Sequence, residues 1–128
     1  MRNYRDLEVW KISHKLTLVL YTASRKFPKE EMFGLTSQLR RAAISIGANL
    51  AEGCGRRTTP EFARFIRIAM GSASELDYHL LLCRDFEFVS KEFYEQSSKE
   101  LIRIRKMLSA LLTSVEEQIQ AKTLAAHG

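Results

Sequence analysis

The chain has 128 residues, of which 45% are hydrophobic and 27% are charged, so we expect one folded domain rather than a disordered segment. Six glycines and two prolines are too few for a turn-rich β fold, and two cysteines do not make a disulfide framework. The net charge of +5 permits a nucleic-acid partner without requiring one. No apolar run reaches the ~20 residues that cross a bilayer, and no signal peptide precedes Leu7, so we expect a cytoplasmic protein with no membrane partner.

Apolar residues in the first half of the chain recur at steps of three and four, which is the period of an amphipathic α-helix. The first predicted helix spans residues 6–27 and ends before Pro28, because proline disrupts a helix interior. The second spans residues 35–52, and Gly53 and Gly55 are predicted to end it. Within the second helix, residues 42–51 carry no charge, and six of these ten residues are Ala, Gly or Ser.

The second half of the chain predicts two longer helices. The third spans residues 60–84, with Thr59 as its N-cap and Pro60 as its first helical residue. The fourth spans residues 90–120, with Ser90 as its cap. Its apolar residues recur in an almost strict heptad pattern and so form one apolar stripe, or seam, along the helix. We expect the bundle domain to comprise residues 1–121 and residues 122–128 to form a flexible tail.

Four helices with short connections predict an all-α fold, an antiparallel four-helix bundle with up-down-up-down topology. The uncharged stretch lacks the polar face of a surface helix, so we expect neighbours inside and outside its own subunit to cover it. Apolar residues also remain outside the helix seams and favour a symmetric homo-oligomer; they are Trp10, Leu18, Ile44, Phe65, Ile68, Leu81, Ile102 and Leu112. The predicted interface residues are Trp10, Ile44, Ala48 and Ala51. The alternative is a monomer that exposes a few apolar side chains.

Several segments, taken in order, resemble the four-helix-bundle family named for the 23S rRNA intervening sequence. They are Asp6–Trp10, Phe27–Pro28, Leu35–Ala43, Asn49–Gly53, Glu61–Phe62, Gly71–Ser72 and Glu75–Leu76. The resemblance covers residues 4–119 and extends, more distantly, to the accessory variability determinant of diversity-generating retroelements. It implies a homopentameric, barrel-like ring of bundles, a role in nucleic-acid binding and no catalytic residues. Where the family often has proline in the second helix, this chain has Gly47, which permits a bend without forcing one.

Nine basic residues are candidate contacts for RNA or DNA phosphates, because guanidinium and ammonium groups bind phosphate oxygens. They are Arg40, Arg41, Arg56, Arg57, Arg64, Arg67, Lys99, Arg103 and Lys106. The most concrete site is the loop of residues 53–59, in which backbone N–H groups, two threonines and two arginines are available for one phosphate, with Glu61 as a competitor. Lys99, Arg103 and Lys106 share one helix face. The alternative interpretation is a capped helix with solvated basic side chains.

Polar residues of the second helix form a stripe that consists of Gln38, Arg41, Ser45, Asn49 and Glu52. Asn49 and Glu52 are candidate ligands or acid–base groups, but we favour a buried hydrogen-bond network that ties helix ends and subunits together. In that network Glu52 can pair with an arginine such as Arg41 or Arg56. His79 and Cys83 supply only half of a zinc site, and the spacing of Glu75 and His79 does not match a di-iron bundle.

We therefore predict no metal, no cofactor, no small-molecule substrate and no enzymatic activity. Two functional classes remain open. The preferred one is a non-catalytic homo-oligomer that binds RNA or DNA through a basic surface, in which case binding is led by the phosphate backbone and is sensitive to salt. The other is a structural or protein-interaction scaffold whose charge only keeps it dissolved.

Overall fold

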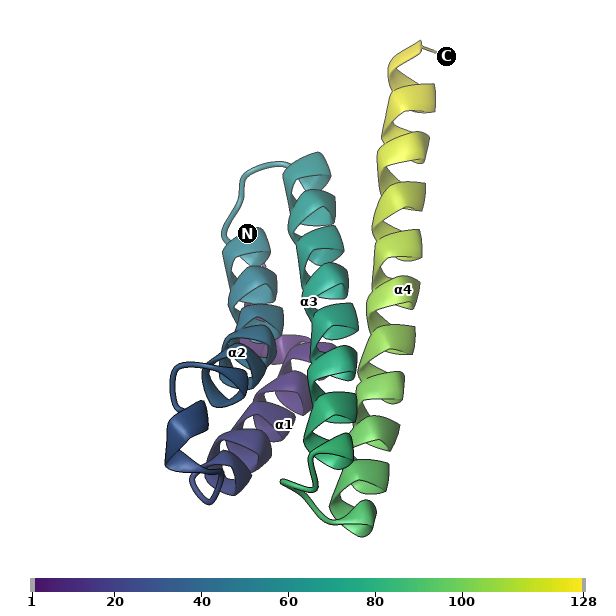
Figure 1. Ribbon diagram of the computed structural model, residues 1–128. Coiled ribbons are helices and arrows are strands. Elements are labelled where there is room, and N and C mark those ends of the chain that lie inside the picture. The colour runs from purple at the N-terminus through teal and green to yellow at the C-terminus, as the bar shows by residue number, and fades with distance from the viewer. Residues whose placement is uncertain (1, 128) are drawn as a thin grey trace.

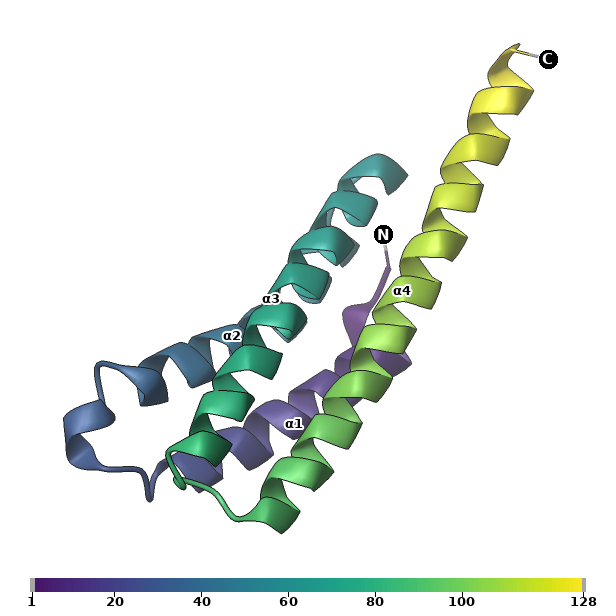
Figure 2. The ribbon, with the colours of Figure 1, turned by 45° about the vertical axis from the view of Figure 1, so that its right-hand side comes forward.

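The computed structural model describes residues 2–127, which contain four α-helices packed as a bundle and no strand (Figure 1, Figure 2). In chain order the elements are η1 (Tyr4–Asp6), α1 (Glu8–Ser24), η2 (Lys29–Glu31), α2 (Leu35–Cys54), α3 (Thr59–Asp85) and α4 (Lys91–His127). The all-helical class and the four predicted helices are therefore confirmed. Among the helices of residues 2–127, we find none that combines the length and the apolar character needed to cross a bilayer.

The first helix is shorter than the predicted 6–27 at both ends. Residues 4–6 form the separate 3₁₀ turn η1, and Leu7 has extended backbone angles before α1 begins. After Ser24 the backbone continues in tighter turns, in which the Phe27 amide donates to the Ser24 carbonyl at 3.1 Å. The apolar period thus located the helix correctly, whereas the hydrogen-bond pattern changes from α to 3₁₀ within one turn of each end.

Two predicted helix ends need correction. Gly53 lies inside α2 and does not end it, because the helix continues to Cys54 and Gly55 is its C-cap. The N-cap of α3 is Thr58 and not Thr59, since the Thr58 side chain accepts a hydrogen bond from the Glu61 amide at 3.3 Å. The cap predicted for α4 is confirmed: the Phe93 amide donates to Ser90 Oγ at 3.1 Å.

The fourth helix is longer than predicted. Residues 122–127, expected to form a flexible tail, instead continue α4 to His127, and residue 128 lies outside the described residues. The physical reason is that nothing between Gln120 and His127 breaks a helix, while the alanines there have the highest helix propensity of any residue. In both ribbon views this end of α4 projects beyond the other helices (Figure 1, Figure 2).

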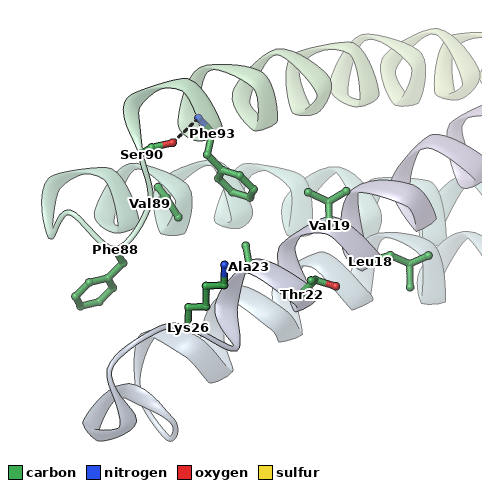
Figure 3. Close-up of a pocket in the computed structure, with 9 residues that line it drawn as sticks. All are labelled: Leu18, Val19, Thr22, Ala23, Lys26, Phe88, Val89, Ser90 and Phe93. Atoms are coloured by element: carbon green, nitrogen blue, oxygen red, sulfur yellow. Dashed lines mark hydrogen bonds between the residues drawn. The ribbon is translucent and has the colours of Figure 1, made fainter.

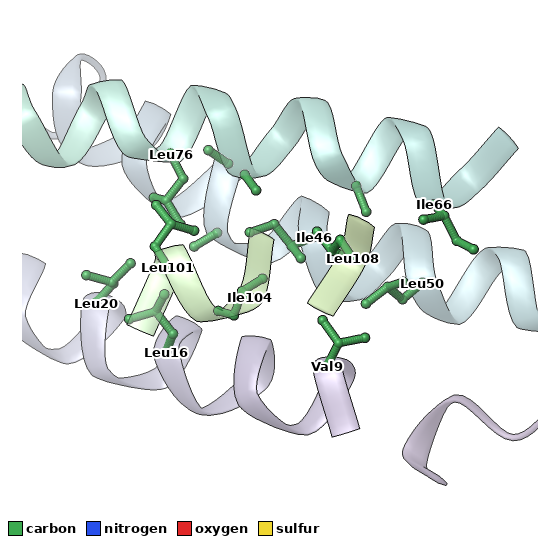
Figure 4. Packing of buried hydrophobic residues seen from close by; sticks show 14 of the residues in the cluster. Val9, Leu16, Leu20, Ile46, Leu50, Ile66, Leu76, Leu101, Ile104 and Leu108 are labelled. Atoms are coloured by element: carbon green, nitrogen blue, oxygen red, sulfur yellow. The ribbon is translucent and has the colours of Figure 1, made fainter. Parts of the chain in front are cut away.

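All four helices contribute to one core (Figure 4). Labelled residues that are at most 5% exposed are Val9, Leu16 and Leu20 of α1, Ile46 and Leu50 of α2, Ile66 and Leu76 of α3, and Leu101, Ile104 and Leu108 of α4. Of the apolar residues predicted to lie off the seams, Leu18, Ile44, Ile68 and Ile102 are exposed in the single chain. Phe65 is an exception: it is buried, because it packs against Gly53 of α2.

The helices do not close evenly around this core. A groove of about 630 Å³ opens between the second half of α1 and the start of α4 (Figure 3). Its walls are mainly apolar and include Val19, Ala23, Phe88, Val89 and Phe93. A second groove, of about 290 Å³, continues along α1 and α4 and shares Val19 with the first.

Candidate nucleic-acid interface

Guanidinium groups gather at the end of the bundle where α2 leads into α3. The Arg2 guanidinium lies 4.3 Å from the ring centroid of Phe62, while those of Arg56 and Arg64 lie 4.9 and 5.3 Å from that of Phe65. A guanidinium that stacks on a ring by one face still presents its N–H donors at the edge. We call Arg2, Arg56, Arg57 and Arg64 the arginine end.

Arg2 was missed by the sequence-based prediction. It joins the arginine end because its backbone amide donates to the Cys54 carbonyl at 3.2 Å, which holds the N-terminal segment against the end of α2. The sequence shows only that the N-terminal region is basic. No local pattern indicates that residue 2 lies beside residues 54 and 62, because that contact is made by the fold as a whole.

Two carboxylates reduce the positive charge of the arginine end. Glu52 Oε1 accepts from Arg56 at 2.7 Å, as one of the sequence-based alternatives predicted, and both side chains are about half exposed. Glu61 Oε2 accepts from the Thr58 hydroxyl at 3.3 Å, and that hydroxyl also caps the Glu61 amide. The Glu61 amide at the start of α3 is therefore already capped, so the predicted loop site offers arginines to a phosphate more readily than it offers this backbone amide.

Two of the nine predicted residues join helices to each other. Arg40 Nε donates to Ser24 Oγ at 2.7 Å, and its guanidinium stacks on Tyr21 of α1 at 3.9 Å. Arg67 pairs with Glu116 of α4 at 2.9 Å. Because both groups have partners that link neighbouring helices, we regard them as structural. Arg41 is exposed on α2 and lies away from the arginine end.

A second basic surface follows the outer side of α4. Lys99, Arg103 and Lys106 are exposed, and their spacing places them opposite the buried residues Leu101 and Ile104. Within residues 2–127 none of the three basic side chains takes part in a salt bridge. Arg103 also lines the smaller α1–α4 groove together with Lys15. We call Lys99, Arg103 and Lys106 the α4 ridge.

The polar stripe of α2 forms a network within the subunit. Asn49 Nδ2 donates to the Ser45 carbonyl at 2.8 Å and lies 2.9 Å from Ser45 Oγ, which in turn is 2.8 Å from Ser72 Oγ of α3. The favoured interpretation is therefore confirmed for two residues of the stripe: Asn49 and Ser45 join α2 to α3 within the subunit. The expected role of this network between subunits stays a prediction. Glu52 pairs with Arg56 and not with Arg41.

The cysteines and histidines do not assemble a reactive centre in the described residues. Burial raises the pKa of the Cys83 thiol to about 11. Burial also raises the pKa of Cys54, and the opposing effect of the Arg2 charge is smaller. Because the thiolate is the reactive form, neither thiol is activated. His79 Nε2 lies 3.8 Å from Glu75 Oε1, and residues 2–127 contain no group of three potential metal ligands.

The four predicted interface residues lie together on one uncharged surface. Trp10, Ile44, Ala48 and Ala51 line a shallow hollow of about 350 Å³ between α1 and α2. Trp10 is stacked on His14, with ring centroids 4.9 Å apart, and lies close to Gly47. In the single chain Ile44 is 47% exposed, so the inner side of this stretch is covered by the bundle while its outer side is open. We call this surface the α1–α2 face.

Comparison with known proteins gives one family and one fold. A family model described as 23S rRNA-intervening sequence protein matches residues 5–110. Among solved structures, the chain is similar to a protein of unknown function from the S23 ribosomal protein family of Bacteroides thetaiotaomicron, with a TM-score of 0.76 and 25% sequence identity. That match covers 82% of this chain and 95% of the other. No curated protein matches the sequence.

Proposed function

Because the chain belongs to the 23S rRNA-intervening sequence protein family, we propose that it is a non-catalytic homo-oligomer that binds the phosphate backbone of RNA or DNA. The observation that carries this proposal is the arginine end, where two buried rings hold three guanidiniums at the surface. Membership shows the family and its fold, whereas the proposed activity depends on this chain's own charges.

The arginine end suits phosphate because its side chains are held in place before a ligand arrives. Stacking on Phe62 and Phe65 limits the rotamers of Arg2, Arg56 and Arg64, so less side-chain entropy is lost on binding. Arg57 is exposed beside them and forms no salt bridge within residues 2–127. Contacts of this kind position a nucleic acid without reading its sequence, and they weaken as salt concentration rises.

The α1–α2 face supports assembly. An uncharged surface that includes Trp10 and Ile44 gains roughly 1.5–3 kcal/mol for each large apolar side chain that a second copy covers, and Ala48 and Ala51 permit close helix contact. We propose that up-down-up-down bundles join through this face in a closed ring, for which the family resemblance implies five copies. A ring would repeat the arginine end and so increase avidity for a long strand.

The direct test is the salt dependence of binding to a short, unstructured oligouridine RNA, measured by fluorescence anisotropy. Arg56→Ala combined with Arg57→Ala removes two phosphate contacts. We expect affinity at moderate salt to fall about tenfold and the slope of log K against log salt to decrease by about 1.4, since each single-strand contact contributes about 0.7.

Arg25→Ala combined with Lys26→Ala is the matched control, because it removes two adjacent exposed charges from the end of α1. Equal losses in the two double variants would mean that only net charge matters. Wild-type affinity that stays constant between low and moderate salt would contradict the proposed function. Light scattering of the same samples measures assembly, and a mass near 14.7 kDa would contradict the homo-oligomer.

A protein-interaction scaffold is the second candidate function, and the groove of about 630 Å³ between α1 and α4 favours it (Figure 3). Its walls expose Leu18 and Val19, which are 56% and 43% accessible. This candidate predicts that Val19→Asp abolishes association with a partner protein, and that the wild-type chain shows no salt-dependent binding of RNA. The two candidate functions are therefore tested by variants at two different sites: the arginine end for RNA binding and the α1–α4 groove for protein association.

A further inference from the structure

The end of α4 extends beyond the residues that the family model matches. That match stops at residue 110. The helix nevertheless continues to His127. We call residues 111–127 the α4 extension, and both ribbon views show it projecting past the other helices (Figure 1, Figure 2).

The base of the α4 extension is fixed to the bundle. Val115 is only 2% exposed, and Glu116 forms the 2.9 Å salt bridge with Arg67 of α3. Ile119, one turn further on, packs against the core cluster. These contacts fix the direction of the remaining turns, so the α4 extension has a defined position relative to α3.

The α4 extension and the start of α3 enclose a cleft of about 460 Å³. One wall belongs to the arginine end and its loop, and the other to the extension. The lining includes Arg57, Thr58 and Thr59 on the first wall, and Lys122 and Thr123 on the second. Each wall therefore contributes a cationic side chain and at least one hydroxyl, and no carboxylate is part of the lining.

We propose that this cleft takes the sugar–phosphate backbone of a nucleic-acid strand, held between Arg57 and Lys122. This inference rests on the proposed function and names a second element of the same site. The amide of Glu61 at the start of α3 is already capped by Thr58, and the hydroxyls of Thr58 and Thr123 already donate to Glu61 and to the Ile119 carbonyl. The strand is therefore bound by a guanidinium fork from one wall and an ammonium from the other, with the Thr59 hydroxyl as a further donor. The strand leaves the arginine end along the α4 extension, where Lys122 adds one more phosphate contact.

Glu61 is the nearby group that opposes this arrangement. Its carboxylate accepts from Thr58, which lines the cleft, and it therefore places negative charge beside the proposed path of the strand. Glu61→Gln keeps a side chain able to form the capping interaction while removing the charge. We expect this variant to bind oligouridine RNA more tightly than wild type, by about threefold at low salt, because one repulsive charge is lost.

The decisive experiment uses Lys122→Ala and Lys122→Glu in the full chain with the same oligouridine RNA. We expect affinity to fall about fivefold for the first variant, and further for the second, with a slope change of about 0.7 for the loss of one contact. Lys91→Ala is the matched control, because it removes the same charge from the other end of the same helix. When Lys122→Ala is combined with Arg57→Ala, the loss should be smaller than the product of the single losses, since both side chains bind one strand.

Each outcome of this experiment bears on one proposal. If the Lys122 variants bind like wild type while the Arg56/Arg57 double variant is weakened, the cleft is excluded and the proposed function stands. If none of these variants changes binding, both the cleft and the arginine end are excluded as the binding site; wild-type affinity that does not fall with salt would contradict the proposed function itself. A uridine mononucleotide that binds as tightly as the oligomer, and loses affinity equally in Lys122→Ala, would show a small-molecule phosphate site and overturn the inference of a strand. Unchanged helical circular dichroism verifies that the variants are folded.

Discussion

The contact between α2 and α3 and the contact between α1 and α4 show two ways in which helices of one bundle meet. Between α2 and α3, small residues of α2 let the two helices approach closely. Gly53 lies against Phe62 and Phe65, and Ser45 Oγ lies 2.8 Å from Ser72 Oγ. Between α1 and α4 there are two grooves, and Val19, which lines both, is 43% exposed. The first contact is closed and the second is open.

The difference separates stability from binding within one small domain. A closed contact stabilises the fold through close packing and satisfied hydrogen bonds, but leaves no room for a ligand. An open contact contributes less to stability and leaves surface for other molecules. The arginine end lies at the tip of the closed contact, where rigid rings hold the guanidiniums, so it combines a stable support with an exposed charge.

The largest expected effect comes from comparing an apolar side chain of the shared core with one that lines the open contact. Leu50→Ala deletes a fully buried side chain of α2 and should lower the free energy of unfolding by about 3 kcal/mol, because it leaves a cavity. Val19→Ala in the open contact should lower it by about 0.5 kcal/mol or less. Urea unfolding at one fixed protein concentration measures both, since assembly makes stability depend on concentration. Equal losses would mean that the α1–α4 contact is closed in solution.

A smaller effect tests the closed contact through its glycine. A Cβ atom at Gly53 would lie 2.8 Å from Phe65 Cβ and 3.0 Å from Phe62 Cδ1. Gly53→Ala should therefore destabilise the protein by about 1–3 kcal/mol through overpacking, and it should also weaken RNA binding by displacing the rings beneath the arginines. Gly71→Ala is the matched control, because no heavy atom lies within 4 Å of that Cβ position. In the middle of α3 this change should stabilise the helix by about 0.5–1 kcal/mol. A thermal melt in which both variants shift in the same direction would contradict the close approach of α2 and α3.

Much of this architecture could be predicted from the sequence because it depends on local periodicity. The four helices and the Ser90 cap follow from spacing and composition alone. The shared surface of Trp10, Ile44, Ala48 and Ala51 does so as well. Gly53 shows the limit of that reasoning. A glycine near the end of a periodic segment usually indicates a helix end. Here the glycine instead allows Phe65, twelve residues further along the chain, to pack closely against α2. Local sequence rules do not predict that contact.

The candidate site was predicted less completely, for the same reason. Arg56 and Arg57 are recognisable in one loop and Arg64 on the third helix, but the Phe65 ring on which Arg56 and Arg64 both stack is evident only in the folded chain. Arg40 and Arg67 looked equivalent to them in the sequence, yet each has a partner on a neighbouring helix. Lys122 was assigned to a tail and instead lines a cleft. Whether a basic side chain is free or engaged is decided by tertiary contacts, which spacing along one helix does not reveal.

The smallest expected effect concerns the turn that ends the open contact. Glu87 has a φ of 62°, in the left-handed region that favours glycine, and it precedes Phe88, which lines the larger groove (Figure 3). Glu87→Gly removes the steric conflict between the side chain and the backbone, and should stabilise the protein by about 0.5–1 kcal/mol. Because the Phe88 amide still donates to the Cys83 carbonyl, the turn itself should keep its shape. A variant that is less stable than wild type in urea would show that the Glu87 side chain makes a favourable contact in solution, and the open region would then be more tightly organised than its grooves indicate.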